Sequence, residues 1–267
     1  MTTRNPAPKF GDMLKVWRER RRMSQLKLAV EAEISQRHLS FVESGRSQPS
    51  RDMVLRLCDY LDVPLRDQNA LLLAAGYAPA FAERSLDDPD LAPARAAIDL
   101  ILKGHMPYPA LAVDRRWTMV AANDAVGGLL AGVAAHLLEP PVNVLRLSLH
   151  PEGLAPRIAN LPVWTAHILE RLRRQHALSG DDGIAELIEE IEGYRTQAGA
   201  SDRAVPVDLD TNAVLVPMVL QTDQGLLSFF STTTVFGTAV EVTLSELILE
   251  AFYPADEETR NRLHARA

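Results

Sequence analysis

Residues 24–46 read SQLKLAVEAEISQRHLSFVESGR, and this stretch decides the fold of the first third of the chain. Ser24 stands directly before an apolar pattern with helical spacing, and Ser35 stands before a second one, so each serine is expected to cap a helix N-terminus. Only residues 31–34 separate the two helices, which is the spacing of a helix-turn-helix. Gly45 follows the second pattern, where a glycine can adopt the left-handed conformation that ends a helix.

Three further helices are predicted around this motif. Phe10, Leu14 and Trp17 recur at helical spacing, and apolar residues repeat in the same way after Ser50 and up to Gly76. Five short helices within about 70 residues predict a compact all-α helix-turn-helix domain over residues 1–80. The three additional helices cover residues 10–21, a segment that Pro49 and Ser50 open, and residues 65–75.

Charge is distributed unevenly along the chain, whose 267 residues carry a formal net charge of −7. Residues 1–80 contain 13 Lys/Arg and 9 Asp/Glu, whereas the remainder contains 15 Lys/Arg and 26 Asp/Glu. The sequence therefore predicts a basic N-terminal module on an acidic body, and a local basic face is what a polyanion binds. The alternative is that the arginine-rich surface is only solvated.

Composition excludes several classes of protein. Hydrophobic residues make up 47% of the chain, yet no run reaches the roughly 18–20 apolar residues of a spanning helix, so a globular protein without membrane association is expected. The single cysteine, Cys58, excludes a disulfide framework and a cysteine-rich zinc site. The N-terminus has no signal-peptide pattern, so a cytoplasmic location is expected.

The N-terminal motif resembles the phage-repressor-like, xenobiotic-response-element family of bacterial regulators, and the resemblance implies a DNA-binding domain. Two turns depart from the family pattern because the usual glycine is replaced, by Arg22 after the first helix and by Glu33 between the second and third. Strained turns are expected at these two residues. The resemblance extends over residues 10–76 and is carried by residues 24–29, 34–39 and 42–46.

The resemblance also implies which residues meet DNA. The N-terminal part of the second helix of such a motif enters the major groove. Gln36 and Arg37 are therefore candidates for base reading, because Gln can bind adenine and Arg guanine in bidentate fashion. His38 and Ser40 are further candidates, and for His38 the alternative is a solvated side chain. N-cap groups and flanking side chains hold phosphates, and here these are Gln25, Ser35, Arg46, Ser47 and Arg51.

A change of pattern marks a second domain after a linker at residues 81–92, where the chain is acidic and contains Pro89. Short apolar runs at 110–114 and 117–122 indicate one hairpin, and runs at 213–220 and 225–235 indicate another. Helical patterns fill the remainder, at residues 94–102, at 123–138, near Val144, around Trp164 and Ile168, and at 184–191. This order predicts an α+β domain over residues 93–267, with an antiparallel sheet and helices on one face.

The C-terminal arrangement resembles a PAS-like sensor, and with residues 247–253 it resembles the ligand-binding domain of MmyB-like transcription regulators. The resemblance implies a sensing domain for an apolar small molecule, with a long-chain fatty acid as the leading candidate, and it implies no other cofactor. It is carried by residues 71–77, 120–123 and 143–146 and by His150 with Pro151.

The second domain contains more apolar strand residues than a sheet with only one buried face needs. Residues 214–220 are apolar on both sides of a predicted strand, so the second face is either covered or lines a cavity. An ordinary packed core or a dimer interface is the alternative. Arg146 or Arg157 is expected to bind an anionic head group, or else to pair with Glu152 or solvent. The predicted pocket lining consists of Trp117, Trp164, Ile168, Phe229 and Phe230.

Other functions are weighed against a sensing regulator. A second domain that only dimerises stays open, whereas an enzyme is disfavoured because the phosphate-loop, nucleophile-elbow and dinucleotide motifs are absent from the sequence. His150, His167 and His176 lack a metal-binding spacing, so no metal site is expected. A homodimer on double-stranded DNA is expected, because one helix-turn-helix makes too few base contacts for gene-level specificity.

Overall fold

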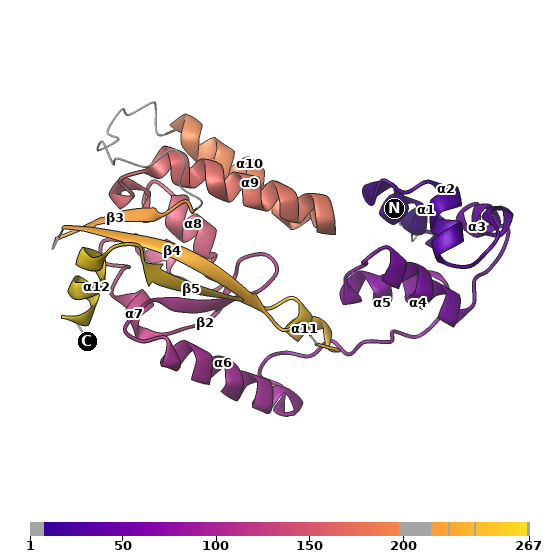
Figure 1. The fold of residues 1–267 in the computed structure, drawn as a ribbon, viewed down its shortest axis with the longest axis horizontal. Coiled ribbons are helices and arrows are strands. Elements are labelled where there is room, and N and C mark those ends of the chain that lie inside the picture. The colour runs from indigo at the N-terminus through magenta and orange to yellow at the C-terminus, as the bar shows by residue number, and fades with distance from the viewer. Residues whose placement is uncertain (1–7, 198–214, 224, 238, 266–267) are drawn as a thin grey trace, which may run out of the picture. The chain divides into compact units, whose positions relative to one another are not determined.

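The computed structural model describes residues 8–197, 215–223, 225–237 and 239–265, and its chain forms two compact units (Figure 1). The first unit contains the described residues up to Arg84, together with the short segments 177–179 and 239–245. The second unit contains the other described residues. Among the described helices, none combines the length and the apolar character that crossing a bilayer requires.

The five helices predicted for the N-terminal unit are confirmed. The side chains of Ser24, Ser35 and Ser50 each accept a hydrogen bond from the backbone N–H three residues on, at 3.1, 3.1 and 3.3 Å. Gly45 and Gly76 have φ angles of +73° and +86°, as predicted for residues that end helices. The helices are α1 (Phe10–Arg20), α2 (Gln25–Glu31), α3 (Gln36–Glu43), α4 (Arg51–Tyr60) and α5 (Leu65–Ala74), and the short α11 (Val242–Ser245) lies in the same unit.

The strain predicted at the two turns without glycine is also confirmed. Arg22 and Glu33 both have a φ angle of +54°. A residue with a Cβ atom loses roughly 1–2 kcal/mol in this conformation, because the Cβ atom approaches the following carbonyl oxygen. The helical domain therefore forms despite a local penalty in two of its turns.

The core of the first unit is closely packed where α1 crosses α3. A Cβ atom on Gly11 would lie 2.2 Å from the backbone oxygen of Glu43, so only glycine fits at this point. Cys58 belongs to the same core, and burial raises the pKa of its thiol to about 12. The thiol therefore stays protonated at neutral pH.

The second unit is built on a five-stranded antiparallel sheet of PAS-like form with the strand order β2-β1-β5-β4-β3. Both predicted hairpins are confirmed, although residues 213, 214 and 224 of the second prediction lie outside the described residues. Residues 215–217 precede β3 without belonging to a strand. The central β5 was not among the predicted strands. The strands are β1 (Ala110–Val113), β2 (Met119–Ala122), β3 (Met218–Thr222), β4 (Gly225–Val235) and β5 (Ile248–Pro254).

The helices of the second unit differ from the prediction in one segment. Residues 123–138 form only α7 (Asp124–Gly127) and the 3-10 turn η2 (Ala135–Leu137), so the predicted helix there is wrong. Glycines interrupt it, and Gly132 has a φ angle of +81°. The remaining helices are α6 (Ala92–Gly104), α8 (Val144–Leu149), α9 (Leu161–Ser179), α10 (Asp182–Gln197) and α12 (Glu257–His264), with 3-10 turns η1 (Pro89–Leu91) and η3 (Ala155–Arg157).

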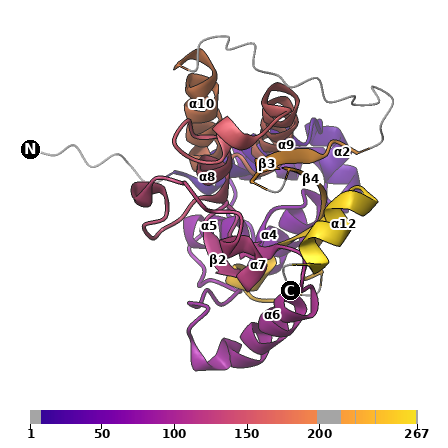
Figure 2. The same cartoon turned by 90° about the vertical axis from the view of Figure 1, so that its left-hand side faces the viewer.

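Helices cover both faces of this sheet, which corrects the prediction of helices on one face. Helices α8, α9 and α10 lie on one side and α6 lies on the other (Figures 1 and 2). Leu111 and Val113 of β1 join the core below α9, whereas Ala110 and Ala112 join a smaller core with α6. The apolar run of β1 is therefore buried on both sides.

Candidate functional site

Helix α3 presents a polar surface to solvent at its N-terminal turn. Leu39 and Val42 are buried against the other helices, so Gln36 and Arg37 point away from the core and are exposed. Side chains placed in this way at the start of the second helix of the motif can reach base edges in a major groove. The other two candidates on this helix, His38 and Ser40, are half-buried.

A buried carboxylate connects the first three helices. Glu43 of α3 accepts hydrogen bonds from Nε and Nη2 of Arg18, at 2.6 and 3.0 Å, and from Nε2 of Gln25 at 2.7 Å. The hydrogen bond to Glu43 raises the pKa of Arg18, so this guanidinium stays charged. Nε2 of Gln25 is therefore engaged within the protein. The contact of Gln25 with the DNA backbone stays a prediction for the other atoms of its side chain.

Two arginines of the predicted DNA surface share one aromatic ring. The guanidinium carbons of Arg37 and Arg46 lie 5.3 and 5.9 Å from the centre of the Phe41 ring. At such distances a guanidinium is attracted by the face of the ring. The backbone N–H groups of Arg46 and Ser47 both donate to the Phe41 carbonyl, at 2.8 and 3.1 Å, and hold the loop after α3. Phe41 thus contacts both Arg37, a candidate for base reading, and Arg46, a candidate for phosphate binding.

The other predicted backbone contacts lie at helix N-termini and in this loop. The Ser35 hydroxyl accepts from the backbone N–H of His38, so its oxygen already caps α3. Arg51 is exposed at the first position of α4, and Ser47 is half-buried. Exposed N–H groups and a positive charge at a helix N-terminus suit a phosphate.

The second unit contains an apolar cavity of about 80 Å³ between the sheet and helices α8 and α9. One buried water needs about 10–15 Å³ measured in this way, so the space is larger than a water requires. Trp117, Trp164 and Ile168, three of the predicted ligand residues, line it. The remaining walls come from Pro109, Leu154 and residues 126–130, from α8, and from all five strands of the sheet.

An ion pair forms the polar edge of the cavity. Arg171 of α9 donates from Nη2 to Glu250 of β5 and, at 2.7 Å, to the hydroxyl of Thr233, which in turn donates to Glu250 at 2.8 Å. The guanidinium carbon of Arg171 lies 4.4 Å from the centre of the Trp117 ring. The Glu250 side chain is only 5% exposed, against 27% for Arg171. The cavity therefore has one charged pair on a surface that is apolar except for Ser148 and Ser231.

The two arginines predicted as candidates for an anionic head group lie outside the lining of this cavity. Neither Arg146 nor Arg157 lines the cavity. Arg146 makes an ion pair with Glu190 at 2.8 Å, and Arg157 donates to backbone carbonyls, including that of Ala131 at 2.7 Å. The signal that could have found Arg171 is helical spacing, since Trp164, Ile168 and Arg171 follow one another at i, i+4 and i+7 on one face.

The two predicted phenylalanines lie near the cavity without lining it. Phe229 is fully buried and contacts the ring of Phe252, a lining residue, edge to face at 6.4 Å. Phe230 stacks on Tyr253 at 5.4 Å. These side chains therefore support the wall or the neighbouring sheet surface.

Backbone strain occurs in the wall of the cavity at Trp117. Its φ angle is +67°, a conformation that bulky residues rarely adopt. The surrounding turn holds it there, because the Asp114 carboxylate accepts from the backbone N–H groups of Arg116 and Thr118, both at 2.8 Å. The indole Nε1 donates to Gln175 at 2.9 Å. Strain that several hydrogen bonds maintain is concentrated at functional sites in proteins.

Comparisons with known proteins match both units. Residues 94–265 match the family model of the MmyB-like transcription regulator ligand binding domain, and residues 9–72 match a helix-turn-helix domain. No curated protein matches the chain. A solved structure titled "Structure of an RNA-binding Light-Oxygen-Voltage Receptor" is similar at 12% identity over 96% of this chain and 62% of its own, with a TM-score of 0.25. The chain thus spans less than two thirds of that receptor chain, and a similarity this low carries no conclusion.

Proposed function

The chain belongs to the family of MmyB-like transcription regulators, and from this premise we propose that it reads a specific DNA sequence in response to an apolar small molecule. The observation that carries this proposal is the pairing of an exposed polar turn on α3 with an apolar cavity in the ligand-binding domain. The proposal places the protein in the cytoplasm, without enzymatic activity.

In the DNA complex, Gln36 and Arg37 read bases and Arg46, Ser47 and Arg51 hold the sugar-phosphate chain. The exposure of Gln36 and Arg37 supports base reading, and the position of Arg46 beside Phe41 supports a backbone contact next to it. Two copies bind two half-sites about one DNA turn apart, because a single motif supplies too few contacts.

The ligand proposed for the cavity is a fatty acid. The apolar walls suit an aliphatic chain, and Arg171 is the cation on the cavity surface that can bind a carboxylate. Because Glu250 already neutralises Arg171, the carboxylate has to displace Glu250 from the guanidinium. The carboxylate of the ligand thereby competes with the buried Glu250 for Arg171. Uncharged molecules of the same chain length do not compete in this way, so their affinity is the informative comparison.

Selection from random oligonucleotides tests the DNA-reading part. We expect Gln36→Ala and Arg37→Ala each to weaken the selected site by about 1–3 kcal/mol and to relax preference at one base position. Arg46→Ala, the matched control, is expected to weaken all sequences alike. An unchanged selected site with Arg37→Ala would contradict the assignment of the reading surface.

Thermal denaturation of the full chain tests the sensing part. Fatty acids of increasing length should raise the melting temperature of the second unit by binding linkage. Ile168→Phe, which fills the cavity, should abolish that increase, whereas Leu100→Phe on the exposed surface of α6 should leave it intact. If no chain length has an effect and native mass spectrometry finds no retained molecule, the second domain is a dimerisation module.

A further inference from the structure

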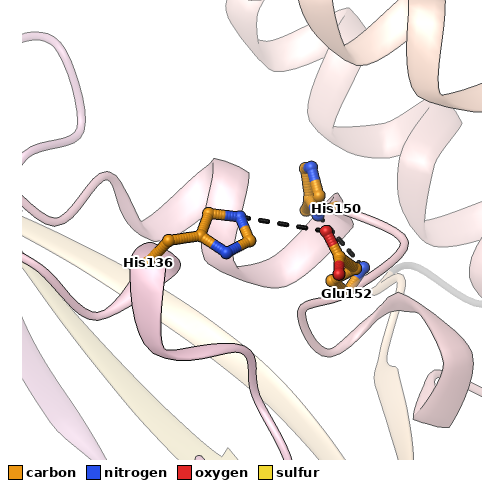
Figure 3. Close-up of side chains that lie close together, drawn as sticks. All are labelled: His136, His150 and Glu152. Carbon is orange, nitrogen blue, oxygen red and sulfur yellow. Dashed lines mark hydrogen bonds and ion pairs between the residues drawn. The ribbon is translucent and has the colours of Figure 1, made fainter.

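Two histidines and a glutamate, none of which lines the cavity, meet in the second unit (Figure 3). His136 lies in η2, His150 follows α8 directly, and Glu152 comes two residues later. One nitrogen or carboxylate oxygen from each residue lies within 4.8 Å of those from the other two, and Nε2 of His136 is 4.0 Å from Oε2 of Glu152. Within the described residues this is the one such group.

The backbone holds this cluster together before any ion binds. The N–H of Ala134 donates to the carbonyl of Glu152 at 3.0 Å, which joins the segment of His136 to the loop after α8. The loop itself is tight, because a Cβ atom on Gly153 would lie 2.2 Å from the carbonyl oxygen of Leu147. The fold therefore brings the side chain of His136 to those of His150 and Glu152, which follow it by 14 and 16 residues in the sequence.

The half-buried His150 has a defined orientation. Its ring contacts those of His136 and Tyr194 edge to face, at 5.7 and 4.9 Å. The backbone N–H of Glu152 donates to its Nδ1 at 3.0 Å, so a lone pair is kept on the nitrogen that faces this loop. A cation can exchange that hydrogen bond for a metal–nitrogen bond.

We propose that His136, His150 and Glu152 bind a divalent transition metal ion of the zinc type. In a tetrahedral site with bonds of about 2.0–2.2 Å, ligand atoms lie about 3.4 Å apart, so ligand atoms that are now up to 4.8 Å apart have to approach by about 1.4 Å. The side chains of His136 and Glu152 are 55% and 66% exposed, and both can make this movement without disturbing the core.

The donor set decides the class of ion. Two imidazole nitrogens and one carboxylate oxygen suit Zn²⁺ and its neighbours in the first transition series, and they leave a position for water or another ligand. Ca²⁺ and Mg²⁺ take sites built from oxygen atoms. Cys58 does not compete for the ion, because its thiol is buried and its pKa is raised.

The position of the cluster connects it to the cavity. Leu129 and Leu130 line the cavity shortly before His136, and Leu147 and Leu154 line it on either side of the loop that bears His150 and Glu152. A bound ion cross-links the two segments that form this wall, and it therefore changes the affinity of the cavity for its ligand, as the ligand changes the affinity for the ion. This consequence rests on the proposed sensing function, whereas the zinc site does not.

Calorimetric titration of the full-length, untagged, chelator-treated protein with ZnCl₂, without any cavity ligand, tests the site. We expect one ion per chain, and we expect His136→Ala and Glu152→Gln each to weaken binding by at least about tenfold. Co²⁺ should show the visible absorption bands of a four- or five-coordinate site in the wild type and lose them in both variants. His264→Ala, which removes an exposed histidine outside the cluster, is the matched control and should bind zinc as the wild type does.

The proposed zinc site is wrong if the wild type takes up no zinc. It is also wrong if His136→Ala and Glu152→Gln bind zinc with unchanged affinity while circular dichroism shows all proteins folded. Because no fatty acid is present in the titration, a failure of the sensing function leaves the outcome for zinc unaffected.

Discussion

Each unit contains a buried carboxylate paired with an arginine, and the two pairs differ in their surroundings. In the first unit the side chains of Glu43 and Arg18 are 4% and 9% exposed within a closely packed helical core. In the second unit Glu250 is as buried, but Arg171 is 27% exposed and borders a cavity. The same type of ion pair is thus enclosed in the core in the first unit and open to a cavity in the second.

The largest effect is expected from removal of the closed pair. Arg18→Ala leaves Glu43 buried without its cation, and such a loss lowers the free energy of unfolding by about 3–5 kcal/mol. Hydrogen exchange of the α1 and α3 amides in urea measures it in the first unit alone. Lys27→Ala is the control, because Lys27 is 64% exposed and its ion pair with Glu31 spans 4.0 Å. Equal effects of Arg18→Ala and Lys27→Ala would show that the buried pair contributes no more to stability than an exposed pair does.

The pair at the cavity should be less sensitive and should affect binding as well. Glu250→Gln keeps the shape of the side chain but removes its charge, and we expect a loss of about 1–3 kcal/mol in the stability of the second unit. Because Arg171 is then no longer neutralised, the affinity for a fatty acid should rise relative to that for its methyl ester. Calorimetry with both compounds measures this ratio, and a ratio equal to that of the wild type would show that the pair does not face the ligand.

The two units also differ in where backbone strain lies. Glu33 is strained in an exposed turn, whereas Trp117 is strained in the cavity wall. Glu33→Gly should therefore stabilise the first unit by up to about 1 kcal/mol, since relief of the left-handed strain outweighs the greater freedom of glycine in the unfolded chain. Glu19→Gly, inside α1, should destabilise it. Urea denaturation measures both, and a loss with Glu33→Gly would mean that the Glu33 turn is not strained.

The smallest effect concerns the pH dependence of the second unit. Burial, followed by the charges of Arg171 and Arg174, lowers the pKa of His167, while Glu250 acts in the opposite direction. The unfolded chain therefore binds a proton first, so stability declines as pH falls below about 6.5 and stops declining below the folded pKa. His167→Gln should remove this component from melting curves recorded between neutral and mildly acidic pH. An unchanged decline would assign it to other groups.

The sequence predicted well those features that depend on neighbouring residues. The capping serines, Gly45 and the strain at Arg22 and Glu33 each follow from a residue type at one position in a local conformation. For the same reason the glycines within residues 123–138 could have warned against a helix there. Apolar periodicity by itself predicts too long a helix in that segment.

Features that depend on distant residues could not be predicted in this way. Arg146 meets Glu190 across 44 residues, and Arg171 meets Glu250 across 79. Which arginine reaches the cavity is decided by the strand order, because β5 from the end of the chain lies in the middle of the sheet. The cluster of His136 with His150 was missed for a similar reason, since the intervening segment folds back by hydrogen bonds that no spacing rule contains.

The chemical inertness of Cys58 makes the protein a convenient subject for spectroscopy. The chain has one cysteine, and its thiol is buried and protonated at neutral pH. Thiolates rather than thiols react with maleimide dyes and nitroxide labels. A cysteine introduced at any exposed position is therefore labelled selectively in the otherwise native sequence. Labels placed in pairs can then record distances between the DNA-binding and ligand-binding units as ligand or zinc is added, without replacement of the natural residue.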